Sequence, residues 1–368
     1  MLLTELPLLV LFNLAVGVLL GSILYRSDFC MAGVFRDIFL LRDYSLFRPL
    51  VLLVLLTAVL FSVARLSGLI LLKSPPVFSY PSLATVIGGF AFGIGMVLAG
   101  GCVVSTVYKM AAGNLASLIA FLGMIAGSML YAESHPWWDL LRTRTALTKN
   151  KMFAEIMPEA DLAVLVAASV LSLALFLHWK RRGILQVEAY AEGYLQPWKA
   201  AVMIAVLNAA VYVLSGWPLG ITTGYAKIAA MLENLVAPAH VAGLRYFNLD
   251  SISVVLPDVR VSGGAGPRAD IILFTQIPLL IGIALGAFFT ALALKEFKIY
   301  GLPPKRQIAS ALMGGILLGL GARIASGCNV TFVLGGVPLF VYQAFLFTAA
   351  MLLGAYAGVR MLRRLVIP

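Results

Sequence analysis

The sequence is poor in charged residues for its length. Only 12% of its 368 residues are charged, whereas globular proteins average about 25%, and 61% of the residues are hydrophobic. The deficit extends over most of the chain and is not confined to one anchor segment. A soluble protein, a disordered chain and a fibrous repeat are therefore excluded, and we predict an all-α polytopic membrane protein.

Residues and motifs that bind metals or nucleotides are also scarce. The three histidines are His135, His178 and His240, which lie in loops or at the end of an apolar stretch. The three cysteines are far apart, so zinc-site spacing and CxxC redox motifs are absent. No Walker, Rossmann or HExxH motif occurs. We therefore expect no metal site, no cofactor, no ATP-driven transport and no enzymatic activity.

Most of the charged residues that are present are basic. The chain has 27 Lys and Arg against 16 Asp and Glu, a net charge of +11. In a membrane protein, Lys and Arg collect in cytoplasmic loops and set the orientation. We therefore expect the lipid bilayer, and not a nucleic acid, as the surrounding partner.

Apolar stretches long enough to cross a bilayer occur about nine times. They lie at about 8–25, 50–72, 83–101, 115–131, 162–178, 200–216, 271–294, 307–326 and 338–358. Alternating spans put the four most basic segments, 26–48, 180–199, 295–306 and 360–364, on one side. The N-terminus is then outside and the C-terminus cytoplasmic. Loops 132–160 and 237–270 lie outside, and we expect them to be polar, irregular surface segments.

An internal repeat divides the chain. Residues 88–102, GGFAFGIGMVLAGGC, align without gaps on residues 314–328, GGILLGLGARIASGC, and match at 7 of 15 positions. FCMAGVFRDIF, around Gly33, resembles GITTGYAKIAA, around Gly224, more weakly. We infer a single membrane domain, residues 1–368, with repeat halves at 8–131 and 200–358.

The connecting span at 162–178 makes the second half enter the membrane from the opposite side. This is an inverted-topology repeat, whose substrate path usually lies on the pseudo-two-fold axis and is lined by short or broken helices. About four segments fit that role, because each follows a break and is too short to cross the bilayer. They are 30–41, 102–112, 220–235 and 328–336.

Glycines at the breaks permit either close helix packing or an anion site. A helix that begins inside the protein offers free N–H groups to an anion, and Gly101 and Gly327 suit such a turn. The other glycines of the repeat are better explained by helix packing. They are Gly89, Gly93, Gly95, Gly315, Gly319 and Gly321.

Each cysteine is the first residue of one of the short segments. Cys102 and Cys328 occupy equivalent repeat positions, and Cys30 begins the segment 30–41. A buried thiol is often only a small hydrophobic group, but a thiol at a helix N-terminus is also a soft hydrogen-bond donor or a reactive group. This pattern favours a substrate that contains sulfur.

Two basic residues lie within otherwise uncharged apolar regions. Arg323 precedes Cys328, and Lys109 follows Cys102. No Asp or Glu occurs in the apolar cores around them, so an anionic substrate, backbone carbonyls or snorkelling to an interface are the alternatives. Arg36 and Lys227 lie nearer to segment ends, where a structural role is favoured.

Three segments carry a resemblance to a known family. RSDFCMAGVFRD at 26–37, GMVLAGGCVVSTVYKMAAGN at 95–114 and LGARIASGCNV at 320–330 resemble the signature segments of the YeeE/YedE family of bacterial inner-membrane proteins. The resemblance implies nine spans and four short central helices around a narrow path, with uptake of thiosulfate. It further implies that Cys30, Cys102 and Cys328 relay the anion, and that a small cytoplasmic sulfur-carrier protein is a plausible partner.

The expected function is therefore a thiosulfate transporter of the inner membrane. We expect Cys30, Cys102, Cys328, Gly101, Gly327, Lys109 and Arg323 to line the transport path. One alternative is a membrane thiol enzyme that transfers sulfane sulfur. Another is a transporter or channel for a different small sulfur or selenium anion.

Overall fold

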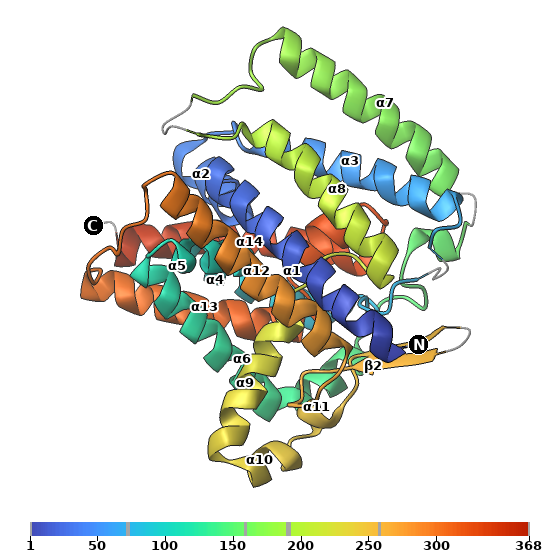
Figure 1. Cartoon of the computed structure of the whole chain (residues 1–368), viewed down its shortest axis with the longest axis vertical. Helices are drawn as coiled ribbons and strands as arrows, with labels where there is room; N and C mark the ends of the chain where they lie inside the picture. The colour runs from blue at the N-terminus through green and yellow to red at the C-terminus, as the bar shows by residue number, and fades with distance from the viewer. Residues whose placement is uncertain (1, 71–73, 158–159, 189–192, 257–258, 367–368) are drawn as a thin grey trace.

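The structure is a computed structural model that describes residues 2–70, 74–157, 160–188, 193–256 and 259–366 (Figure 1). The described chain is almost entirely helical, as predicted. The described residues form helices and one β-hairpin. They are α1 (Leu2–Ser27), α2 (Met31–Leu41), α3 (Phe47–Leu66), α4 (Leu83–Leu98), α5 (Val103–Ala111), α6 (Leu115–Arg144), η1 (Phe153–Glu155), α7 (Ala160–Arg181), α8 (Pro197–Ser215), α9 (Thr222–Val236), α10 (Pro238–Gly243), α11 (Arg245–Asn248), β1 (Ile252–Leu256), β2 (Val259–Gly263), α12 (Ile271–Ala293), α13 (Lys305–Ile324), η2 (Val330–Gly336) and α14 (Tyr342–Leu365).

Nine segments of the described chain are long and apolar enough to cross a membrane, which confirms the predicted number. Two of these segments combine a long helix with the short helix that follows it. Leu6–Leu41 contains α1 and α2, and Leu83–Ala111 contains α4 and α5. Each break is therefore part of an apolar run, which is why hydropathy alone does not separate the two helices.

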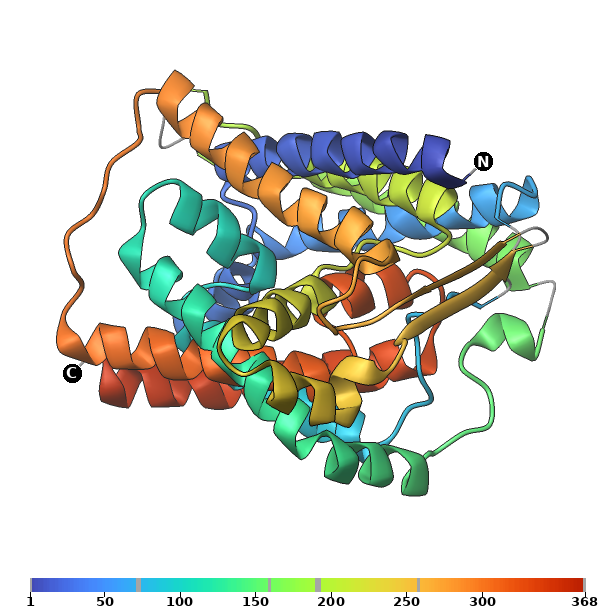
Figure 2. The same ribbon diagram turned by 60° about the horizontal axis from the view of Figure 1, so that its bottom comes forward.

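The bundle has two distinct ends (Figure 2). One carries the N-terminus and the β1–β2 hairpin, and we call it the hairpin end. The other carries the C-terminus and the connection from α12 to α13, and we call it the basic end. At the basic end, Arg26 donates to the carbonyl of Gly193 at 2.9 Å, and Arg48 donates to that of Ile184 at 2.7 Å. The basic segments 26–48 and 180–199 therefore meet there.

The long helices pair in a pattern that an inverted repeat predicts. Helix α1 packs along α12, and α8 packs along α3; α4 packs along α14, and α13 packs along α6. In the repeat, α1 corresponds to α8, α3 to α12, α4 to α13 and α6 to α14. Exchanging each helix for its counterpart therefore turns the α1–α12 pair into the α8–α3 pair, and the α4–α14 pair into the α13–α6 pair. Helix α7 packs mainly on α3 at one edge of the molecule (Figure 1).

The repeated glycine segments cross each other at the centre. A Cβ on Gly88 would lie 2.7 Å from the carbonyl oxygen of Gly321, and a Cβ on Gly95 would lie 2.8 Å from that of Gly314. Because Gly88 aligns with Gly314 and Gly95 aligns with Gly321, the two contacts are related by the repeat. Only glycine allows α4 and α13 to approach this closely.

The other repeat glycines have the packing role that the sequence suggested. A Cβ on Gly93 would lie 2.2 Å from a backbone oxygen of α14, and one on Gly319 would lie 2.2 Å from a backbone oxygen of α6. Gly89 and Gly315 also face backbone oxygens of α14 and α6. The glycines therefore set the distance between the central helices.

The two outer loops are more regular than predicted. Helix α6 continues to Arg144. Its last turns are polar, so an apolar run does not reveal them in the sequence. Residues 237–270 contain α10, α11 and an antiparallel hairpin in which Ile252 pairs with Gly263. The prediction of irregular segments was wrong here, since short-range helix and hairpin pairing satisfies the backbone without apolar periodicity.

Candidate functional site

Four short helical segments lie at the predicted positions. Helices α2, α5 and α9 begin at residues 31, 103 and 222, and η2 covers residues 330–336 as a π-helix. Three of them start at a cysteine whose carbonyl accepts from the N–H four residues on. The acceptors are Cys30, Cys102 and Cys328, at 2.9, 2.9 and 2.8 Å. The fourth, α9, begins after Ile221 and has no cysteine at its start. This agrees with the weaker repeat match, in which Cys30 has no cysteine counterpart.

The turn before α5 positions Cys102. Gly100 has a φ of 70°, a left-handed conformation that glycine adopts without strain. Ser105 accepts from the backbone N–H of Cys102 at 2.6 Å through its hydroxyl oxygen, and a Cβ on Gly101 would lie 2.7 Å from that hydroxyl. The Cys102 side chain faces the backbone of Ser105 in return, as in a capping box. The thiol is thus held against the start of the helix.

The equivalent turn in the second half positions Cys328 in a similar way. Ser326, which aligns with Gly100, also has a left-handed φ, of 65°. The Cys328 sulfur lies 3.7 Å from the Thr331 hydroxyl oxygen. A Cβ on Gly327 would lie 2.9 Å from the ring of Phe332, so a larger residue would displace the first turn of η2. Both predicted glycines therefore border a cysteine-bearing turn.

Buried amides satisfy the backbone where the helices break. Asn208 donates to the carbonyl of Leu334 in η2 at 2.9 Å and accepts from the N–H of Leu219 at 3.0 Å. Gln276 accepts from the first turn of α9, at Gly224, at 2.7 Å. Irregular backbone at membrane depth needs such partners, because no bulk water is available. Asn208 and Gln276 were not predicted as structural residues. The sequence feature that could have indicated them is a side-chain amide inside an apolar span.

The three cysteines lie in a connected region. The thiols of Cys30 and Cys102 are within hydrogen-bonding reach of each other, and all three cysteines are free and buried. Tyr225 of α9 is close to both Cys102 and Cys328, and its hydroxyl donates to the carbonyl of Val103 at 2.6 Å. Its ring is 2% exposed. Tyr225 is therefore a buried residue close to the cysteines that precede η2 and α5.

A cavity of about 250 Å³ lies at the hairpin end and contains the guanidinium of Arg323. Arg323 donates to the hydroxyl oxygens of Thr222 at 2.6 Å, Tyr246 at 3.1 Å and Thr223 at 3.3 Å. Its Nε has no hydrogen-bond partner among the described residues, and none of their carboxylates pairs with it. Arg323 is only 6% exposed, so it does not snorkel.

Other polar groups of this cavity were not predicted. Arg142 of α6 lines it and donates to the Tyr131 hydroxyl at 3.1 Å. His135 lines it too, and its Nδ1 is buried without a partner among the described residues. Thr331, which contacts Cys328, forms part of the floor. Arg142 and His135 were not predicted to line a cavity, because residues 132–160 were expected to form an external loop and not part of α6.

Asn329, directly after Cys328, is fully buried, and neither amide atom has a partner among the described residues. Such a group costs about 1–3 kcal/mol unless something hydrogen-bonds to it. It offers both a donor and an acceptor beside the thiol.

A second cavity, of about 550 Å³, lies at the basic end. It is lined by Tyr108, Lys109 and Asp28, and the Lys109 ammonium is 4.0 Å from the Asp28 carboxylate. The Tyr108 hydroxyl donates to the same carboxylate at 3.1 Å. Lys109 therefore has an acidic partner, which adds to the three alternatives drawn from the sequence. Asp28 lies in the break between α1 and α2, outside the apolar cores.

A smaller cavity, of about 40 Å³, lies between the two ends. Cys102, Ser105 and Tyr108 line it on the α5 side, and Leu334 and Val330 of η2 line it opposite. Its remaining walls are mostly apolar. The described residues thus provide a polar cavity at each end and a small, mostly apolar cavity between them that the Cys102 side chain lines.

Comparison with known proteins identifies the family. The family model described as sulphur transport matches residues 26–357. The chain belongs to the sulphur transport family. The resemblance to YeeE/YedE proteins is thereby confirmed, and the matched region includes all four short segments of this family member.

Full-length relatives of this sulphur transport family protein carry a specific name. It is 25% identical to the thiosulfate transporter TsuA of Escherichia coli, over 95% of this chain and 94% of that protein. It is 29% identical to TsuA of Spirochaeta thermophila, over 93% and 96%. A shorter match, 34% identical over 22% of this chain, is to the probable transporter YedE of E. coli.

Proposed function

We propose that this chain is a thiosulfate transporter that takes up the anion across a bacterial inner membrane. The observation that carries the proposal is the succession of three cysteine-bearing helix starts between a cavity at the hairpin end and a cavity at the basic end. The names of the full-length relatives support the same substrate.

The proposed direction follows from the charge distribution. The basic end carries Arg and Lys segments from both halves, which favours a cytoplasmic location. The N-terminus and the hairpin end are then external, and the cavity around Arg323 is the entrance. Lys109 lies at the exit, beside Asp28.

In the proposed mechanism, the dianion first meets the Arg323 guanidinium and the cavity's hydroxyl groups. Arg323 has a positive charge without a carboxylate partner among the described residues, so an entering anion supplies the missing countercharge. From there the anion passes to Cys328, where Thr331 and the free amide of Asn329 offer further hydrogen bonds.

The next proposed step crosses Tyr225. The thiols of Cys102 and Cys328 are both close to this tyrosine, and the thiol of Cys30 is within hydrogen-bonding reach of Cys102. Thiols are weak hydrogen-bond donors, so each contact is weak enough to release the anion to the next. Gly101 and Gly327 keep the helix starts open to it. A small cytoplasmic sulfur-carrier protein would receive the product, a partner that we propose from family resemblance alone.

The contact between Cys30 and Cys102 also suits a thiol enzyme. In that reaction a cysteine thiolate attacks the outer sulfur of thiosulfate, the sulfur–sulfur bond breaks, and sulfite leaves with its electron pair while a persulfide remains on the cysteine. The two functions differ in whether thiosulfate arrives intact.

The test is uptake by proteoliposomes of thiosulfate labelled separately on each sulfur. Transport predicts that both labels enter together and that Cys102→Ala, Cys328→Ala and Cys30→Ala each reduce uptake severely. Labelled sulfate and selenite, added separately, test selectivity. Wild-type uptake by Cys102→Ala would refute the relay, whereas a persulfide with stoichiometric sulfite release would establish the enzyme instead.

A further inference from the structure

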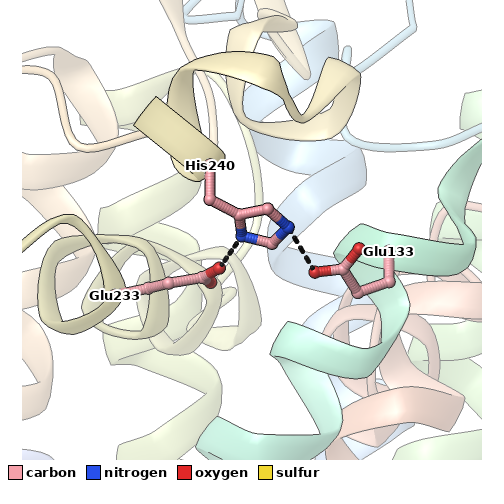
Figure 3. Close-up of side chains that lie close together, drawn as sticks. All are labelled: Glu133, Glu233 and His240. Carbon is pink, nitrogen blue, oxygen red and sulfur yellow. Dashed lines mark hydrogen bonds and ion pairs between the residues drawn. The ribbon is translucent and has the colours of Figure 1, made fainter. Parts of the chain in front are cut away.

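A cluster of metal-ligating side chains lies outside the path, at the hairpin end. Glu133 of α6, Glu233 of α9 and His240 of α10 converge there, and one ligand atom from each lies within 4.8 Å of the others (Figure 3). The cluster was not predicted from the sequence, because the three residues are distant along the chain. We expected no metal site because the histidines lie in loops or at the end of an apolar stretch. That expectation did not take Glu133 and Glu233 into account.

The imidazole of His240 stands between the two carboxylates. Its Nδ1 is 2.6 Å from an oxygen of Glu233, and its Nε2 is 3.2 Å from an oxygen of Glu133 (Figure 3). A proton on Nδ1 donates to Glu233, which is the more buried carboxylate, with 17% of its side chain exposed. Nε2 then faces the Glu133 carboxylate, and at that distance either a proton on Nε2 or a bound metal cation joins the two atoms.

We propose that His240 Nε2 and Glu133 bind a zinc ion, or a similar divalent transition metal, and that Glu233 orients the imidazole. In tetrahedral zinc sites the metal lies about 2.0–2.2 Å from nitrogen and oxygen ligands, so neighbouring ligand atoms are roughly 3.3 Å apart. The observed 3.2 Å between Nε2 and the Glu133 oxygen matches one such edge. A carboxylate on the other ring nitrogen is the usual support for a zinc-bound histidine.

The remaining coordination positions are open to water. His240 and Glu133 have 48% and 51% of their side chains exposed, so solvent reaches the site and a metal can enter without unfolding. The site connects three helices. Glu233 belongs to α9, whose first residues, Thr222 and Thr223, hold Arg323 at the entrance cavity. Bound metal would therefore fix the outer end of α9 and α10 against α6.

The test uses the full-length protein purified in detergent and freed of metal. Zinc binding is measured by calorimetry, and cobalt is used as a spectroscopic probe of tetrahedral nitrogen and oxygen ligation. We expect one site per chain that disappears in His240→Gln and in Glu133→Gln. Glu233→Gln should bind zinc about 10- to 100-fold more weakly, as is typical of a group that supports a metal ligand.

The matched control is His178→Gln, which removes an exposed histidine from α7 and should bind zinc like the wild type. The three buried cysteines are present in every variant, so any zinc they bind is common to all. Equal zinc binding by the wild type and His240→Gln would overturn the proposal. So would the absence of stoichiometric binding, in which case an imidazolium joins the two carboxylates without metal.

Discussion

Arg323 offers the sharpest test of the entrance cavity. Replacing it by Gln removes the charge and the unpartnered Nε while keeping a polar side chain in the cavity. A hydrogen bond to a charged group is worth about 1.5–3 kcal/mol, and each 1.4 kcal/mol is a factor of ten in affinity. If that Nε binds the anion, KM for thiosulfate should rise roughly 10- to 150-fold in Arg323→Gln.

The assay is the concentration dependence of labelled thiosulfate uptake into proteoliposomes. Arg323→Lys keeps the charge but cannot reach Thr222, Thr223 and Tyr246 together, so its KM should lie between the two. Arg306→Gln, an exposed change at the basic end of the same helix, should leave KM unchanged. A folded Arg323→Gln protein with wild-type KM would refute the assignment of Arg323 to anion binding.

Three further changes test other parts of the structure. Tyr225→Ala should let sulfate pass together with thiosulfate, because it removes a buried ring close to both Cys102 and Cys328; Tyr225→Phe should keep selectivity in the same uptake assay. Gly93→Val should abolish folding, judged by size-exclusion chromatography, since even a Cβ would overlap backbone of α14; Gly301→Ala has open space around it and should fold normally. Lys227→Met leaves the Asp270 carboxylate, whose side chain is 15% exposed, without its fully buried partner at 2.9 Å and should cost about 3–5 kcal/mol in denaturant unfolding, so unchanged stability would contradict this assignment.

The sequence predicted the parts of the fold that depend on local composition. Nine spans follow from apolar length, and the breaks follow from a glycine or a cysteine at the end of an apolar run, so α2 and α5 start within one residue of the expected positions. The central crossing also agrees with the repeat, because Gly88 and Gly95 were already matched to Gly314 and Gly321. These features need no knowledge of distant contacts.

The missed features depend on contacts between distant segments. Asp28 meets Lys109 only because α1 and α5 are brought together. Lys227 seemed to be a segment-end residue, yet it is fully buried and donates to Asp270 and to two carbonyls of the loop before α12. Arg142 and His135 enter the cavity because α6 extends beyond its apolar part. Hydropathy records none of these proximities.

The glycine crossing of α4 and α13 restricts how the molecule can move. Rocking one half against the other would separate Gly88 from Gly321 and Gly95 from Gly314 at the same time, since the repeat relates the two contacts. Collective domain motions take microseconds to milliseconds, whereas side-chain rotations take picoseconds to nanoseconds. Under the proposed function, this close central contact favours transport by small side-chain movements over rocking of the two halves, and selectivity then depends on buried side chains such as Tyr225.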